Sequence, residues 1–209
     1  MTAHYTLHGI WASGPAYKVA LMLSLTGTKF DYVHVDLMKG AQKQPDYMVK
    51  NPFGVVPTLI SNTTGRVYCQ SSAILEHLAK ASDKFVGDSE DEHERAREWT
   101  YWGWDRLAKG IYRTRAAKLG FAKFPQEVFD STLADGMAGL KFLDDRLAKN
   151  TFVAGGKHPT FADIDLYGVV HYAPQAGIDL KDFPHVAAWV AKIEKLPHFA
   201  KPEDLMSKS

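Results

Sequence analysis

The sequence predicts a small α/β unit followed by an all-α unit. In the first eighty residues, short strand-like runs alternate with helix-like runs. Beyond Gly87 there is no convincing strand, and apolar residues recur at helical spacing instead. The length of 209 residues is compatible with one domain or two, because domains typically hold about 150 residues. The change of pattern near residue 81 therefore favours two.

The first unit, residues 1–81, is predicted to run β-α-β, then an irregular connector, then β-β-α. Strands are expected at 5–8, 30–36, 55–60 and 66–69, and helices at 15–26 and 71–81. A right-handed crossover makes the first two strands parallel neighbours. The short turn at 62–65 makes the last two strands a hairpin.

The second unit, residues 88–209, is predicted to contain only helices. Ser89 and Glu92 form a capping-box pattern, which opens a long helix toward Ala117. Further helices are expected to begin near Pro125, Thr160 and Pro184, the last of them closed by Pro197.

Composition excludes several classes of protein. Twenty-five Lys and Arg against 24 Asp and Glu give a net charge of +1, which argues against a nucleic-acid binder. The single cysteine, Cys69, excludes an intrachain disulfide framework, and no histidine spacing indicates a metal site. No apolar run approaches the roughly 20 residues that span a bilayer, and the first residues lack a secretion signal. We therefore expect a cytoplasmic protein with no metal, membrane or nucleic-acid partner.

Three segments of the first unit place polar groups at the ends of predicted elements. Ser13 precedes the first helix, where its hydroxyl can donate to an anion held by the helix N-terminus or can simply cap the helix. Pro57 is either an edge-strand proline or part of a cis bond that turns the Val56 backbone outward. Gln70 and Ser71 begin a helix whose N-terminus suits a carboxylate, or Ser71 is an ordinary cap.

In order and spacing, these segments resemble the glutathione-site motifs of the cytosolic glutathione transferase family. The matching segments are 39–45, 51–57 and 70–74 in the first unit, and 160–163 and 183–189 in the second. The serine-type classes, phi-like or related bacterial members, are the most similar. The resemblance implies a thioredoxin-like first domain and a homodimeric detoxification enzyme. Its co-substrate would be glutathione, and its partners small hydrophobic electrophiles.

The resemblance also implies residue roles. Ser13 matches the catalytic serine that hydrogen-bonds the glutathione sulfur. The implied glutathione-binding residues are Gln42, Lys43, Val56, Pro57, Gln70 and Ser71. Of these, Lys43 would hold the glycyl carboxylate and Val56 the cysteinyl backbone, while Gln70 and Ser71 would hold the γ-glutamyl end. In phi-like members a histidine often replaces Gln42 and a glutamate often replaces Gln70.

The chemistry requires a thiolate near neutral pH, because the thiolate is the nucleophile. Lowering a thiol pKa from ~8.5 to about 6.5 requires ~2.7 kcal/mol of preference for the anion. One charge-assisted hydrogen bond contributes ~1.5–3 kcal/mol and a helix end ~0.3–1 kcal/mol. Ser13 and the first helix could therefore supply the shift without a metal.

Other positions are expected to shape the electrophile site and the dimer. The candidates for electrophile contact in the cleft are Trp11, Tyr101, Trp104 and Asp105, with core packing as the alternative for the aromatic ones. Tyr101 and Asp105 are expected to share a helical face at i and i+4. Phe53 matches a family position that often inserts into a neighbouring subunit.

Several alternatives remain open from the sequence. A non-catalytic ligand carrier or interaction protein would keep the fold without turnover, and a peroxidase, isomerase or dehalogenase would share the activated thiolate. Cys69 is expected to be a buried, inert thiol, which disfavours thiol–disulfide reductase chemistry. Tyr17 is a rival hydroxyl for Ser13, with packing as its expected role.

Overall fold

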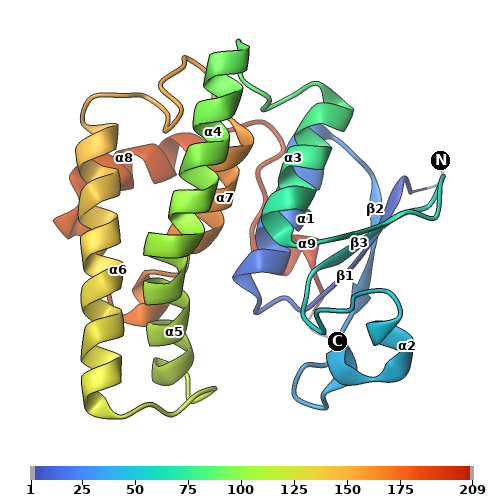
Figure 1. The fold of residues 1–209 in the computed structure, drawn as a ribbon. Coiled ribbons are helices and arrows are strands. Elements are labelled where there is room, and N and C mark those ends of the chain that lie inside the picture. Colours follow the sequence, from blue (N-terminus) through green and yellow to red (C-terminus); the bar gives the residue numbers. More distant parts are fainter. Residues whose placement is uncertain (1–2, 208–209) are drawn as a thin grey trace. The chain divides into compact units, whose positions relative to one another are not determined.

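The computed structural model describes residues 3–207, which form two compact units. One contains the chain up to Asp83 together with the segment from Leu196 onward, and the other spans Lys84–Lys195. Figure 1 shows the sheet of the first unit and the helices of the second. None of the helices within residues 3–207 is long and apolar enough to cross a membrane.

The first unit is built on a four-stranded sheet in the order β2-β1-β3-β4 (Figure 1). The strands are β1 (Tyr5–Gly9), β2 (Phe30–His34), β3 (Thr58–Ser61) and β4 (Val67–Cys69). β1 pairs parallel with β2 and antiparallel with β3, and β3 and β4 form an antiparallel hairpin. The predicted pairing is confirmed, and the architecture is the thioredoxin-like one that the resemblance implies.

Three helices complete this unit. α1 (Gly14–Thr26) and α3 (Ser71–Ser82) pack against each other. Leu7 and Leu59 from neighbouring strands are fully buried and belong to the main core. α1 ends where predicted, because Gly27 takes the left-handed conformation (φ 74°) that glycine adopts without a steric penalty. α2 (Pro45–Met48) is a single turn that places Tyr47 in a smaller, separate core.

The third strand begins three residues later than predicted. The peptide bond between Val56 and Pro57 is cis, and Pro57 has no N–H to donate to a ladder. The Val55 carbonyl accepts from Tyr47 Oη (2.9 Å) and Asn51 Nδ2 (2.8 Å). Residues 55–57 therefore form a loop ahead of the sheet, and the strand proper starts at Thr58.

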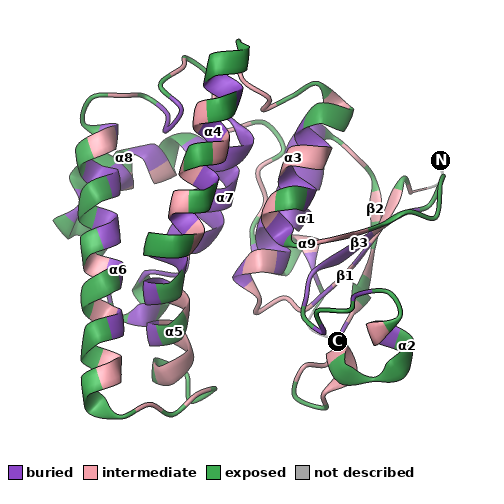
Figure 2. Ribbon diagram, viewed as in Figure 1, coloured by how far each residue is buried: buried purple, intermediate pink, exposed green. Residues whose placement is uncertain are grey.

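The second unit contains helices and turns in its described residues. Its helices are α4 (Glu90–Trp102), α5 (Lys109–Lys118), α6 (Gln126–Leu147), α7 (Phe161–Val170) and α8 (Pro184–Ile193). A π-helical stretch, Gly103–Ala108, joins α4 to α5, so the long predicted helix is continuous but not uniformly α-helical. α7 is buried along its whole length and forms the core of the unit (Figure 2).

Both predicted helix caps are present, and the cap at α4 differs from the prediction in one hydrogen bond. Ser89 Oγ accepts from the Glu92 N–H at 3.2 Å, as predicted, but the Glu92 carboxylate reaches back to the N–H of Asp88 instead of Ser89. At α7, the Asp163 carboxylate accepts from the Thr160 N–H (2.8 Å) and hydroxyl (3.1 Å). These side chains satisfy N–H groups that a helix start leaves without partners.

The last residues pack with the first unit, although the sequence places all of residues 88–209 in one helical domain. α9 (Pro202–Leu205) contacts α1. Tyr17 Oη donates to the Ala200 carbonyl at 3.0 Å, and Ser24 Oγ donates to the His198 carbonyl at 2.7 Å. Hydroxyls on α1 thus provide the partners that this irregular segment cannot find within itself. Tyr17 accordingly has the packing role expected for it.

Candidate functional site

Ser13 lies at the N-terminus of α1, in extended conformation (φ −87°, ψ 116°). Its Oγ accepts from the Ala16 N–H at 3.3 Å, so the capping role considered from the sequence is present. The hydroxyl proton is not donated to any residue in the described part of the chain. Ser13 can therefore cap the helix and still donate a hydrogen bond to an anion at the helix N-terminus.

The Val56–Pro57 loop is held from within by a buried polar network. Asn51, which is fully buried, donates from Nδ2 to the Val55 carbonyl and to Thr58 Oγ1 (3.0 Å). Tyr47 Oη shares a hydrogen bond with the same Thr58 hydroxyl at 2.8 Å. The backbone N–H and C=O of Val56 have no hydrogen-bond partner among residues 3–207. A peptide-like ligand could pair with both groups.

Gln70 is the N-cap residue of α3 but makes no side-chain cap. Its φ of 67° is uncommon for a residue other than glycine and costs of order 1–3 kcal/mol, a strain that is found mainly at functional sites. Gln70 is exposed, whereas the following Ser71 is buried and its hydroxyl has no described partner. The uncapped start of a twelve-residue helix suits a carboxylate.

The sheet register brings these three segments to one edge. His8 of β1 pairs with Thr58 of β3, and Thr58 pairs with Cys69 of β4. Ser13 follows the end of β1, Val56 and Pro57 precede β3, and Gln70 follows β4. A hydroxyl, an open pair of backbone groups and a helix N-terminus therefore lie along the same edge of the sheet.

The connector between β2 and α2 adds a cation near this edge. The Lys43 side chain lies over Gly54, since a Cβ added to Gly54 would be 2.8 Å from Lys43 Nζ. Lys43 forms no ion pair with a carboxylate in residues 3–207. The neighbouring Gln42 has a buried Oε1 without a hydrogen-bond partner. Phe53, in the same region, is 56% exposed.

Two comparisons with known proteins decide the family. The model of the glutathione S-transferase N-terminal domain matches residues 3–80, and the C-terminal domain model matches residues 126–192. Glutathione S-transferase theta-3 of Mus musculus is 30% identical over 193 residues, covering 87% of this chain and 78% of the relative. The chain belongs to the glutathione S-transferase family.

Other relatives match almost the full length. Maleylacetoacetate isomerase of Rhizobium meliloti is 28% identical over 199 residues, covering 90% of each chain. The crystal structure of a glutathione S-transferase from Pseudomonas fluorescens is similar in fold, with a TM-score of 0.90 and 27% identity over 96% of this chain and 99% of that chain. The predicted fold class is confirmed for both units.

In this member of the glutathione S-transferase family, the residues expected at the electrophile site have different surroundings. Trp11 is half-buried in the loop before Ser13, whereas Tyr101 is 65% exposed on α4. Trp104 contacts the Tyr112 ring at a centroid distance of 6.2 Å. Asp105 lies in the π-helical stretch, where its carboxylate pairs with Arg106 (2.8 Å) and Lys109 (3.3 Å).

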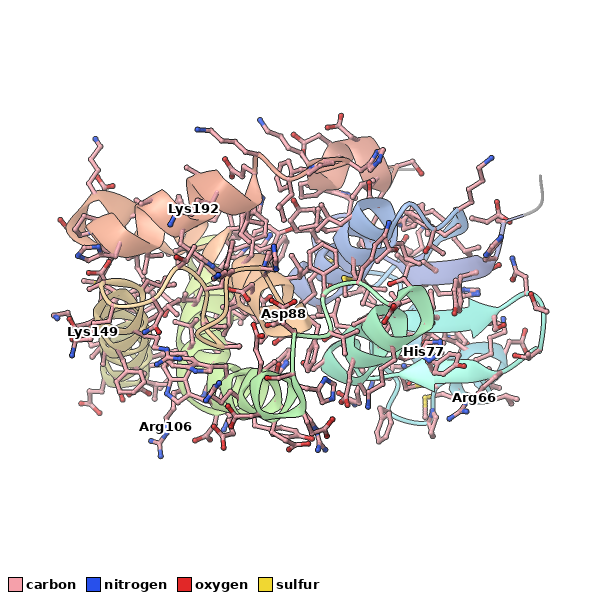
Figure 3. All side chains as sticks on the ribbon, turned by 90° about the horizontal axis from the view of Figure 1, so that it is seen from above. Arg66, His77, Asp88, Arg106, Lys149 and Lys192 are labelled. Atoms are coloured by element: carbon pink, nitrogen blue, oxygen red, sulfur yellow. The ribbon has the colours of Figure 1, made fainter. Side chains whose placement is uncertain are left out.

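A hollow of about 330 Å³ lies against α6 in the helical unit. Its lining residues are Trp102, Asp105, Arg106, Lys109, Asp135, Ala138, Gly139 and Phe142. The rings of Trp99, Trp102 and Phe142 pack at centroid distances of 5.0–5.9 Å beside it. Arg106 extends outward from the helix (Figure 3). Asp105 is the single predicted electrophile residue in this lining.

Sequence reasoning missed the residues that hold the Val56 loop. Tyr47 and Asn51 belong to no recognised catalytic pattern, although a buried polar network of this kind determines where the loop backbone lies. The available signal was the Asn-Pro pair at 51–52, which is typical of a turn. Cys69 is half-buried, its Sγ lies 3.7 Å from the Lys50 carbonyl, and burial raises the pKa of its thiol.

Proposed function

We propose that the protein is a glutathione-dependent enzyme in which Ser13 stabilises the glutathione thiolate for attack on a small hydrophobic electrophile. The observation that carries the proposal is the alignment of Ser13, Val56 and Gln70 along one edge of the sheet. Each of these residues presents a hydrogen-bonding group that no described residue uses. Glutathione, a tripeptide with a thiol between two charged ends, has groups for each of them.

The thiolate would lie at the N-terminus of α1. The Ser13 hydroxyl accepts from the Ala16 N–H, which polarises its O–H and strengthens donation to an anion. The helix has 13 residues, so its dipole adds to the same effect. Together these contributions match the ~2.7 kcal/mol needed to lower a thiol pKa by about two units.

The two ends of glutathione would be recognised by charge. Its γ-glutamyl carboxylate would bind at the N-terminus of α3, with Ser71 and Gln70 as donors. Its glycyl carboxylate would face Lys43, with the Gln42 amide beside it. The cysteinyl backbone would pair with the N–H and C=O of Val56, next to Pro57.

Replacing Ser13 by alanine tests the catalytic role. We expect Ser13→Ala to lower the rate of thiol conjugation ~10-fold or more, because the thiolate loses its hydrogen bond. Titrating glutathione while following thiolate absorbance near neutral pH should show the thiolate signal in the wild type and its loss in the variant. Unchanged turnover with glutathione still bound would show that another group activates the thiol.

Ser13→Gly and Ser13→Thr are the matched controls. Glycine costs a helix N-cap only a few tenths of a kcal/mol, so Ser13→Gly separates the lost hydroxyl from a weakened helix. Threonine keeps both the cap and the donor, so Ser13→Thr should retain more activity than either other variant. This pattern would support a serine-type class. Within that class the chain differs from phi-like members at Gln42 and Gln70, where those members often carry a histidine and a glutamate.

Isomerisation is the second candidate, favoured by the match to maleylacetoacetate isomerase over 90% of both chains. In that reaction the thiolate would add to a cis double bond and leave after rotation, so glutathione is regenerated. Conjugation consumes one glutathione for each product. Measuring free thiol during turnover of a maleyl-type diacid and of an aryl halide separates the two. A non-catalytic carrier would bind glutathione and turn over neither.

We further propose a homodimer in which Phe53 of one copy enters the aromatic-lined hollow of another. Phe53 is exposed, and Phe142 at the hollow is 55% exposed, so both present apolar surface. Phe53→Ser should weaken dimerisation at least ~10-fold in sedimentation analysis. Val49→Ser, at a position that is 87% exposed, is the matched control. Equal association of both variants would contradict this contact.

A further inference from the structure

The turn between α5 and α6 exposes two large apolar side chains. Leu119 is 43% exposed and Phe121 is 60% exposed. α5 ends there because Gly120 takes a left-handed conformation (φ +77°) and the Phe121 N–H returns to the Ala116 carbonyl at 2.8 Å. A Cβ at Gly120 would meet no atom within 4 Å, so the outer side of the turn is open. Figure 1 shows the turn at the end of the helical unit remote from α8.

The same turn lies in a basic stretch of the sequence. Residues 106–126 contain six Lys and Arg and no Asp or Glu, although the whole chain has a net charge of only +1. Three of the cations, Arg113, Lys118 and Lys123, are exposed and pair with no carboxylate among the described residues. Arg113 lies over the Phe124 ring at 5.0 Å. The stretch is bounded by Asp105, which pairs with Arg106 and Lys109, and by Glu127 in the first turn of α6.

We propose that this turn is a docking site for an anionic lipid surface. Leu119 and Phe121 would enter the headgroup region while Arg113, Lys118 and Lys123 face lipid phosphates. A lipid surface fits better than a protein partner, because apolar side chains at the end of a turn insert between lipids and surrounding cations attract the anionic headgroups. Such peripheral binding needs no spanning helix. The sequence predicts no membrane partner because no segment could span a bilayer. The proposed docking site differs from that prediction, since it requires only binding to the membrane surface.

Co-sedimentation with lipid vesicles tests the proposal. We expect the full chain to bind vesicles of phosphatidylcholine mixed with phosphatidylglycerol and not to bind vesicles of phosphatidylcholine alone. The bound protein should dissociate as the salt concentration rises above about 0.1 M. Leu119→Ser combined with Phe121→Ser should weaken binding ~10-fold. Lys118→Glu combined with Lys123→Glu should weaken it by a similar factor.

Two control pairs match these changes elsewhere. Met38→Ser with Val49→Ser removes apolar groups that are 81% and 87% exposed. Lys149→Glu with Lys192→Glu makes the same charge change at positions visible in Figure 3. Lys149 follows the far end of α6, a helix of 22 residues. Both control pairs should bind vesicles as the wild type does.

Three results would overturn the proposal. The first is no binding of the wild type to the anionic vesicles. The second is an equal loss in the control pairs, which would show general adhesion. The third is full binding by the Leu119 and Phe121 double variant, which would show that charge alone acts and that nothing inserts. Thermal unfolding of each variant checks that it is folded.

Discussion

Single buried polar side chains determine where several loops of this protein lie. Asp163 accepts four hydrogen bonds, from the Thr160 N–H and hydroxyl, the Val153 N–H and Trp189 Nε1. Asn51 positions the loop before β3 through three hydrogen bonds, two donated from Nδ2 and one accepted at Oδ1. Removing either side chain would take hydrogen-bond partners from buried polar groups, which typically costs about 1–3 kcal/mol for each group left without one. At this scale the fold depends on hydrogen bonding as much as on apolar packing.

The surroundings of His8 predict that the free energy of unfolding depends on pH. It is half-buried, its ring makes a T-shaped contact with the Tyr47 ring, and burial, with a smaller contribution from Lys50, lowers its pKa. The unfolded chain therefore binds a proton more readily as the pH falls through about 6.5. The free energy of unfolding should decrease over that range. His8→Phe should show a smaller decrease between about pH 7.5 and pH 5.5 in urea unfolding.

The control for this prediction is His4→Phe, the same replacement at an exposed position. A remaining decrease in the His8 variant is expected, because burial also lowers the pKa of His77, which stacks on Tyr68 and binds Tyr5 Oη. Figure 3 shows His77 on the side of the first unit that also carries Arg66. An identical pH dependence in the wild type and the His8 variant would contradict the assignment.

Pairs of helices are brought together by glycine where their backbones approach most closely. Gly110 of α5 faces Gly136 of α6, and a Cβ added to Gly110 would lie 2.4 Å from the Gly136 nitrogen. The reverse substitution is milder, since a Cβ on Gly136 would lie 3.3 Å from the nearest Gly110 atom. Gly139 approaches the Arg106 carbonyl in the same way. Glycine lowers helix propensity, so these positions trade local stability for close packing.

Because the contact is asymmetric, alanine at Gly110 and alanine at Gly136 should affect stability differently. Gly110→Ala should lower the free energy of unfolding by at least about 2 kcal/mol, because the clash is with backbone that cannot move aside cheaply. Gly136→Ala should change it by less than about 1 kcal/mol, since the gain of ~1 kcal/mol in helix propensity offsets mild crowding. Urea unfolding measures both. Equal effects of the two substitutions would contradict the predicted asymmetry of this contact.

At the scale of the whole molecule, the chain returns to its first unit after completing the helical one. Pro202 and Met206 are buried there, and the segment is tied to α1 through Tyr17 and Ser24. α1 also carries Ser13 at its N-terminus. The C-terminal segment therefore supports the helix on which the proposed thiolate site depends.

Shortening the chain tests this support. A chain that ends at Lys195 loses two hydrogen bonds and the burial of Met206, so its thermal unfolding midpoint should fall clearly below that of the full chain. Tyr17→Phe removes only one hydrogen bond and should cost about 1 kcal/mol. Circular dichroism during heating measures both. An unchanged midpoint in the shortened chain would show that the segment contributes no stability.

Local patterns were sufficient for most elements. Strand alternation, helical spacing and the stop at Gly27 predicted the element order and the parallel and antiparallel pairing of the sheet. Boundaries failed where side-chain hydrogen bonds compete with the local pattern. The run from Val55 is strand-like, yet Tyr47 and Asn51 take the Val55 carbonyl away from any ladder. The π-helical stretch likewise has no local signature that distinguishes it from an α-helix.

By itself, the sequence determined the two-unit fold class, the family resemblance and which residues to examine at the thiol site. Those properties follow from short-range periodicity and from motifs that are contiguous in the chain. Only the tertiary structure decided that Ser13, Val56 and Gln70 lie on one edge of the sheet, and that the C-terminal segment belongs with α1. Both facts depend on strand register and on hydrogen bonds between residues far apart in sequence. Such contacts form only when the whole chain has packed.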